Sequence, residues 1–156
     1  MINLMRVDHR LLHGQVAFSW TNALSTDCIL IANDSVPTDD IRKTTLKLSK
    51  PNGVKLVIKS IDDAITAINS GVTDKYKLFI IVETIHDAAR MVEGCPTVRA
   101  VNLGGTRKAE DKKAISKFIF ASESDIDDIR SMLQAGAEVE LRQVPSDTKI
   151  KAQEVI

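Results

Sequence analysis

The sequence predicts an α/β fold in which an open, mostly parallel, doubly wound sheet of about seven strands carries helices on both faces. Short apolar runs alternate with segments of helical periodicity along nearly the whole chain, which is the pattern of parallel strands joined by helical crossovers. One run, Lys77 to Glu83, is almost uninterruptedly apolar, as expected for a strand covered on both faces. At 156 residues the chain is long enough for one well-buried core and too short for two ordinary domains, so we expect one domain over residues 1–156.

Each expected strand is a short apolar run that ends at polar, glycine or proline residues. The last strand alternates apolar with polar side chains up to Pro145, so one of its faces should be partly exposed to solvent. The connection between residues 103 and 114 is short for a helical crossover, which leaves room for one of the last two strands to run antiparallel at the sheet edge. Residues 146–156 carry no pattern. In chain order the expected strands cover residues 2–7, 27–33, 54–58, 77–83, 98–103, 115–121 and 139–144.

The segments between these strands have apolar residues spaced by three and four, as on one face of a helix. The first helix should bury Val16, Trp20, Ala23 and Leu24. A helix over residues 39–50 has carboxylates in its first turn, where they favour the helix dipole. The later helices end near glycines at positions 71, 94 and 136. The predicted N-caps are Thr38, Ser60, Thr84 and either Ser122 or Ser124.

The charge balance argues against nucleic acid as a partner. There are 21 basic and 21 acidic residues, and no aromatic residue lies in a basic stretch that is interleaved with aromatic residues. No apolar run approaches the roughly 20 residues of a membrane span, so membrane association must come through a partner. Cys28 and Cys95 lack C-x-x-C spacing and no secretory leader is visible, so we expect free thiols and a cytoplasmic protein.

The most informative stretch runs from Arg6 to Val16. It places two arginines, two histidines and a carboxylate in the turn between the first strand and the first helix. In open α/β sheets such turns lie at the carboxyl ends of the strands, where ligands bind, and the N-terminus of the following helix attracts anions. The stretch therefore predicts a site for phosphate or another oxyanion.

His13 is the first candidate for chemistry, because it stands at the opening of the helix. A neutral imidazole has one nitrogen available to attack phosphorus, while the amides of Gly14, Gln15 and Val16 can point at the transferred oxygens. Gly14 would let the backbone approach the group closely. The alternative is a histidine that lines or caps the turn without chemistry.

Arg10 and Arg6 bracket His13 on its N-terminal side, and a guanidinium can give a phosphoryl group two hydrogen bonds at once. The alternative for either is a solvated surface charge. Asp8 could hold an arginine or orient the ring of His13, or it could accept backbone amides in the turn, and both roles could coexist.

Weaker signals follow other strands. His9 and His13 are four apart, but no further histidine or cysteine offers a third ligand, so we expect no metal. No P-loop or G-x-G-x-x-G spacing is present, and we expect no cofactor. Helix capping and a tight turn explain the remaining candidates adequately, although they could also line the cleft: Asn33, Asp34, Thr84, Gly104, Gly105 and Thr106.

The stretch from Arg6 to Val16 resembles the active-site signature of the IIB subunits in the mannose/fructose/sorbose family of the bacterial phosphoenolpyruvate-dependent sugar phosphotransferase system. Asn33-Asp34, the Gly104-Gly105 turn and a closing strand that ends in proline add to the resemblance. Family members often have methionine where Thr106 stands.

The resemblance implies a phosphotransferase component with a transient phosphohistidine at His13, on the δ nitrogen, and with Arg10 and Arg6 in the same signature. It further implies that phosphate comes from the phosphohistidine of a IIA domain and passes to a sugar bound by the membrane subunits IIC and IID, at the inner face of the membrane. The resemblance does not decide whether the protein forms a homodimer.

Two rival hypotheses fit the same residues. The first is a stand-alone α/β enzyme acting on a phosphorylated small molecule, with His13 as general base and the arginines as a clamp. The second is a non-catalytic module that binds a phosphorylated small molecule or senses a partner's phosphorylation.

Overall fold

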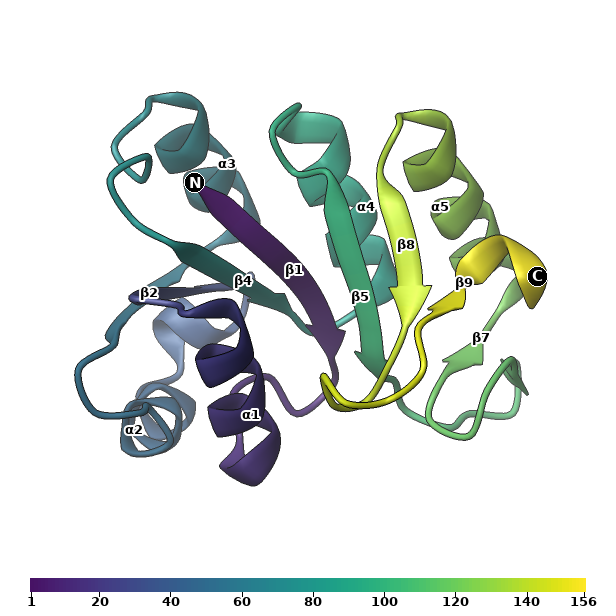
Figure 1. The fold of residues 1–156 in the computed structure, drawn as a ribbon, viewed down its shortest axis with the longest axis horizontal. Coiled ribbons are helices and arrows are strands. Elements are labelled where there is room, and N and C mark those ends of the chain that lie inside the picture. Colours follow the sequence, from purple (N-terminus) through teal and green to yellow (C-terminus); the bar gives the residue numbers. More distant parts are fainter.

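The computed structural model describes the backbone of residues 1–156 and the side chains of all of them except Gln15 and Val16. Across this backbone seven strands form one sheet in the order β3-β2-β4-β1-β5-β8-β9, with every neighbouring pair parallel except β8 and β9 (Figure 1). The strands are β1 (Ile2–Asp8), β2 (Cys28–Ala32), β3 (Lys55–Lys59), β4 (Leu78–Val82), β5 (Ala100–Gly105), β8 (Glu138–Leu141) and β9 (Ile150–Lys151). The predicted fold class is confirmed.

Helices cover both faces of the sheet (Figure 1). One face packs against α1 (Gly14–Leu24) and α2 (Asp40–Leu48), and the other packs against α3 (Ile61–Asn69), α4 (Ile85–Gly94) and α5 (Glu123–Gln134). Two short 3₁₀ turns complete the main fold, Val36–Thr38 and Ala152–Glu154. No helix in the described part of the chain is long and apolar enough to cross a membrane.

The alternating directions of strand side chains split the core into two layers. In β4, Ile80 and Val82 pack toward α3, α4 and α5, whereas Phe79 and Ile81 pack toward α1 and α2. All five residues of β4 are buried, which confirms the strand predicted to be covered on both faces. Each such side chain contributes about 1.5–3 kcal/mol through its burial, so both layers of helices are held by the central strands.

Three of the predicted helix caps are confirmed. The side chains of Ser60, Thr84 and Ser122 each accept a hydrogen bond from the backbone N–H three residues ahead. Asp125 returns a bond to the backbone N–H of Ser122 and completes a capping box. This reciprocal pair makes Ser122, rather than Ser124, the cap of α5.

Two details of the first helices were predicted wrongly. Asp39, not Thr38, caps α2, because Thr38 belongs to the preceding 3₁₀ turn and the Asp39 carboxylate accepts from the N–H of Arg42. In α1, Ala23 is exposed, since the face that meets the sheet runs through Ala17 and Trp20. The predicted inward position of Val16 lies outside the described side chains.

The C-terminal third departs most from expectation. Residues 115–121 do not form a strand of the main sheet: they make the turn and the second strand, β7 (Phe120–Ala121), of a separate hairpin whose first strand is β6 (Lys113–Ala114). The antiparallel edge strand exists, but β9 provides it, in the tail whose sequence carries no pattern. Glu140 of β8 is buried rather than exposed to solvent, because the Arg142 guanidinium binds both of its carboxylate oxygens at 2.9–3.2 Å.

Gly104 and Gly105 were predicted to form a turn but lie at the end of β5. The pairing of β1 with β5 shifts register there, so that Val7 pairs with Leu103 and Asp8 with Gly105, which leaves Gly104 as an extra residue. A Cβ atom on Gly104 would lie 2.1 Å from Cζ of Arg6. The Arg6 guanidinium therefore occupies the space that a side chain at position 104 would fill.

We expect Gly104→Ala to lower the free energy of unfolding by about 1–3 kcal/mol, because the methyl group overpacks the buried guanidinium. Gly105→Ala is the matched control, since its Cβ would meet its nearest neighbour, Nδ1 of His9, at an ordinary 3.4 Å. Urea denaturation followed by circular dichroism measures both. Equal stabilities for the two variants would contradict this account of Gly104.

Candidate functional site

The carboxyl ends of β1 and β5 form a topological switch point of the sheet. The connection that leaves β1 passes over the face of α1 and α2, and the connection that leaves β5 passes toward α5 on the opposite face. Ligands of open α/β sheets bind in the crevice that such a divergence creates. The predicted stretch from Arg6 to His13 lies at this crevice.

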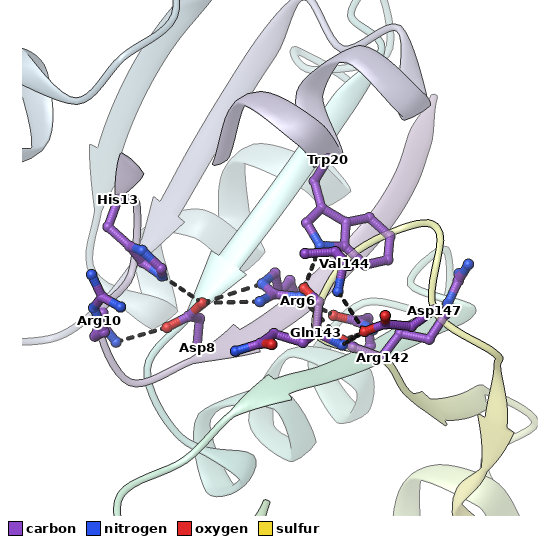
Figure 2. A network of polar contacts seen from close by, with 10 residues as sticks. Arg6, Asp8, Arg10, His13, Trp20, Arg142, Gln143, Val144 and Asp147 are labelled. Carbon is purple, nitrogen blue, oxygen red and sulfur yellow. Dashed lines mark hydrogen bonds and ion pairs between the residues drawn. The ribbon is translucent and has the colours of Figure 1, made fainter. Parts of the chain in front are cut away.

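Asp8 is the centre of the polar network (Figure 2). Its Oδ2 atom lies 2.9 Å from Nε2 of His13 and accepts from Nε and Nη2 of Arg6 at 3.3 and 3.2 Å. Its Oδ1 atom accepts from the backbone N–H of Arg10 at 2.9 Å. The structure thus contains both sets of contacts predicted for Asp8, those to side chains and those to the turn.

The environment of Asp8 keeps its carboxyl ionised. Burial alone would raise its pKa, but the hydrogen bond from His13, the charge of Arg6 and the backbone N–H of Arg10 outweigh burial and hold the pKa below its ordinary value. An ionised carboxylate only accepts hydrogen bonds. The proton between the two residues therefore lies on Nε2 of His13, which leaves the lone pair of the neutral ring on Nδ1.

His13 is the N-cap residue of α1, with extended backbone angles (φ −154°, ψ 145°), but its side chain makes no capping hydrogen bond. The ring is instead held by Asp8, and its side chain keeps 17% of its surface exposed. Gly14 follows with φ +36°, a conformation that side chains with a Cβ rarely adopt. The predicted phosphate contacts of Gln15 and Val16 lie outside the described residues.

Arg6 is buried and its donors already have partners. Besides Asp8, its Nη1 atom donates to Oδ1 of Asn102 at 2.7 Å and to the carbonyl of Arg142 at 3.3 Å. Burial lowers the pKa of Arg6, and the charge of Asp8 opposes that change. The guanidinium of Arg6 holds Asp8 and also lines the cavity in front of His13, and its direct contact with phosphate stays a prediction.

Trp20, expected only as a core residue, is part of the same network (Figure 2). Its Nε1 atom donates to the carbonyl of Gln143 at 2.9 Å, and the guanidinium carbons of Arg6 and Arg142 lie 5.4 and 5.1 Å from its ring centre. The sequence did contain one signal for the residues that surround Arg6: Asn102 is a polar residue inside an apolar strand, and it is fully buried. Arg142 and Gln143 also follow a strand of the sheet.

A cavity of about 220 Å³ opens in front of His13. The charged side chains that line it comprise Asp8 and three cations, Arg6, Arg10 and Lys117. Among the described residues, none pairs with the guanidinium of Arg10, which is exposed. Lys117 was not predicted, because it lies in the hairpin that was read as a strand. The other lining residues are His9, His13, Gly104, Gly105, Thr106, Phe118, Phe120 and Gln143.

Thr106 fastens the hairpin to the end of β5. Its hydroxyl donates to the carbonyl of Phe120 at 2.9 Å and accepts from the N–H of the same residue at 2.7 Å. Thr84 caps α4 and lines a smaller neighbouring cavity of about 70 Å³, which His9 and Thr106 also line. Gly104, Gly105 and Thr106 are therefore cleft residues as predicted, and Thr84 lies beside the cleft.

Asn33 and Asp34 do not line the cavity, and of the two roles left open for them the structure shows the local turn and cap contacts. They follow β2, which β4 separates from β1. The Asn33 side chain accepts from the N–H of Ser35 and turns the chain, and Asp34 pairs with Arg90 at 2.7 Å. Within the described part of the chain, no group of three histidine, cysteine, aspartate or glutamate side chains is placed to hold a metal ion.

Known proteins are similar to this chain in fold and in sequence. The crystal structure of the IIBSor domain of the sorbose permease from Klebsiella pneumoniae superposes with a TM-score of 0.93 at 29% sequence identity, covering 99% of this chain and 94% of that one. The sorbose-specific EIIB component of Lacticaseibacillus casei is 34% identical over 147 residues, covering 94% of this chain and 90% of the relative.

The mannose-specific EIIAB component of Escherichia coli K12 is 31% identical over all 156 residues, and the chain spans about half (48%) of that relative. The family model described as "PTS system sorbose subfamily IIB component" matches residues 2–156. The chain therefore belongs to the sorbose subfamily of phosphotransferase-system IIB components.

Proposed function

We propose that this chain is the phosphoryl carrier of a sugar phosphotransferase system. As a single domain it accepts phosphate on His13 from the phosphohistidine of a IIA domain and passes it to a sugar bound by the membrane subunits IIC and IID, on the cytoplasmic side. The observation that carries the proposal is the 2.9 Å contact between Nε2 of His13 and buried Asp8, at a cavity whose lining includes three cations, Arg6, Arg10 and Lys117. The name of the mannose-specific EIIAB relative supports a IIA partner.

The nucleophile in this mechanism is Nδ1 of His13. Its lone pair forms the new P–N bond as the P–N bond of the donor breaks, and the electron pair of that bond stays on the donor's imidazole. The phosphorylated ring of His13 is positively charged as long as it keeps the proton on Nε2. The carboxylate of Asp8 stabilises that charge directly through the hydrogen bond on Nε2.

The oxygens of the transferred group need positive charge around them. Phosphoryl transfer depends mainly on positioning and electrostatic stabilisation, and a guanidinium meets two oxygens at once. Arg10 is the arginine free to do this, because Arg6 is occupied by Asp8 and Asn102. The N-terminus of α1, which begins at Gly14, adds partial positive charge. No metal ion or nucleotide is needed for these steps.

Incubation with labelled phosphoenolpyruvate, the general phosphotransferase proteins and a IIA domain should give an acid-labile, alkali-stable adduct. His13→Ala should abolish it, because the accepting nitrogen is lost. His86→Ala is the control and should label normally, since its side chain is 69% exposed and pairs with Asp128 on α5. Turnover of a free phosphorylated substrate without an adduct would favour the stand-alone enzyme, and neither adduct nor turnover would favour a binding module.

Arg10→Lys should leave the fold intact and slow transfer by about tenfold or more, because an ammonium group is a point charge and cannot make the two parallel hydrogen bonds of a guanidinium. Rapid-quench measurement of single-turnover labelling gives the rate. The control is Arg130→Lys, on the surface of α5, which should transfer normally. A normal rate in Arg10→Lys would remove Arg10 from the mechanism.

Asp8 should make stability fall in acid. Because its pKa is lowered in the folded protein, its contribution is present above the unfolded value of about 4 and is lost as the pH falls through the folded value. Asp8→Asn should be less stable at neutral pH and should flatten this acid dependence. Urea unfolding at several pH values measures it, and Asp127→Asn, an exposed substitution, should keep the wild-type profile. An unchanged profile in Asp8→Asn would contradict the assignment.

A further inference from the structure

The turn of the β6–β7 hairpin presents an aromatic ring beside the phosphoryl site. We define the hairpin tip as Ser116, Lys117 and Phe118. Phe118 keeps 42% of its surface exposed and lines the His13 cavity. Lys117 lines the same cavity. An exposed phenylalanine at the rim of a site that works on a charged group is not explained by the core or by the chemistry.

The hairpin tip is held in a defined conformation. The hydroxyl of Ser116 accepts from the backbone N–H groups of Phe118 and Ile119 at 3.3 and 3.2 Å, and Ile119 is buried. The N–H of Thr106 donates to the carbonyl of Phe118 at 3.0 Å, which ties the tip to the chain that follows β5. Phe118 is therefore held at the surface by a network of backbone hydrogen bonds.

A second, larger cavity of about 500 Å³ adjoins the His13 cavity on the other side of the tip. Gly104, Lys117, Phe118 and Gln143 line both cavities, so the two cavities are neighbours, and we call them together the groove. The far end of this groove is bounded by Ile150 of β9, which is 38% exposed. The larger cavity therefore lies between the hairpin tip and β9, and it meets the His13 cavity at the tip.

Geometry restricts what can cover this groove. Direct transfer between two imidazoles requires the donor nitrogen and Nδ1 of His13 to approach opposite sides of one phosphorus atom, with reacting atoms about 3–3.5 Å apart. A protein donor at that distance must contact the rim of the His13 cavity. The rim combines cations, which suit the phosphoryl dianion, with one exposed aromatic ring, a residue type that often anchors interfaces.

We infer that the hairpin tip and the adjoining groove are the docking surface for the phosphoryl donor. This inference rests on the proposed function and names the contact through which the donor is recognised. Phe118 is the apolar anchor that the donor buries in the complex, and Lys117, which lines the His13 cavity, supplies positive charge for the phosphoryl group. The donor is a protein that carries a surface phosphohistidine with apolar side chains beside it.

The test compares two donors with wild type and Phe118→Ala. One donor is a phosphorylated IIA domain, which must dock, and the other is phosphoramidate, which is too small to use the surface. We expect Phe118→Ala to raise the KM for the IIA domain about tenfold or more, as for loss of an interface anchor. We expect an unchanged rate with phosphoramidate. Phe118→Leu should restore most of the affinity, because leucine keeps an apolar side chain at the tip.

Ile41→Ala is the matched control, since Ile41 is 81% exposed on α2, far from the hairpin (Figure 1), and should leave both rates unchanged. Equal slowing of Phe118→Ala with both donors would assign Phe118 to chemistry and overturn the inference. Normal transfer from the IIA domain with slower transfer onward to membranes containing IIC and IID would assign the tip to the acceptor and also overturn it. Failure of wild type to be labelled by either donor would overturn the proposed function itself.

Discussion

The buried carboxylate of Asp8 is the interaction on which the site depends. One oxygen is shared by the Arg6 guanidinium and the His13 ring, and the other fixes the turn through the N–H of Arg10. A buried charge is costly unless it is paired and hydrogen-bonded, so these contacts stabilise one another. Losing one of them would leave the remaining charges without compensation. Asp8 thus holds the ring of His13 in place and fixes which ring nitrogen carries the proton, although Asp8 does not contact phosphate in the proposed mechanism.

The fold supplies Asp8 and its partners from neighbouring strands. Arg6 and Asp8 come from β1, Asn102 comes from β5, and the carbonyl of Arg142 follows β8. The register shift at Gly104 makes the space between β1 and β5 into which the Arg6 guanidinium fits. Specific sheet pairing is therefore a condition of the chemistry, because the network forms only when three strands are in their observed registers.

Much of this arrangement was predictable from the sequence, for physical reasons. The charged turn after β1 is a local feature, since the cap position of His13 and the spacing to Asp8 lie within one short segment. Helix caps such as Ser60 and Thr84 are equally local. The roles of Arg6, Asn102 and Trp20 depend instead on pairing between residues far apart in the chain, which periodicity does not encode. The hairpin at 113–121 was missed because its apolar residues are as frequent as those of a strand. The turn that interrupts this segment depends on a single side chain, the hydroxyl of Ser116, which accepts two backbone hydrogen bonds.

Trp20 is the one tryptophan in the sequence, and it lies against the guanidinium of Arg6, which in turn holds Asp8. The indole is buried, so its surroundings are made of protein groups rather than bulk water. A new charge on His13 would reach this ring through only two intervening side chains. The protein thus contains an intrinsic fluorophore two side chains away from its reactive centre, and we expect its emission to change when the carrier is loaded and unloaded.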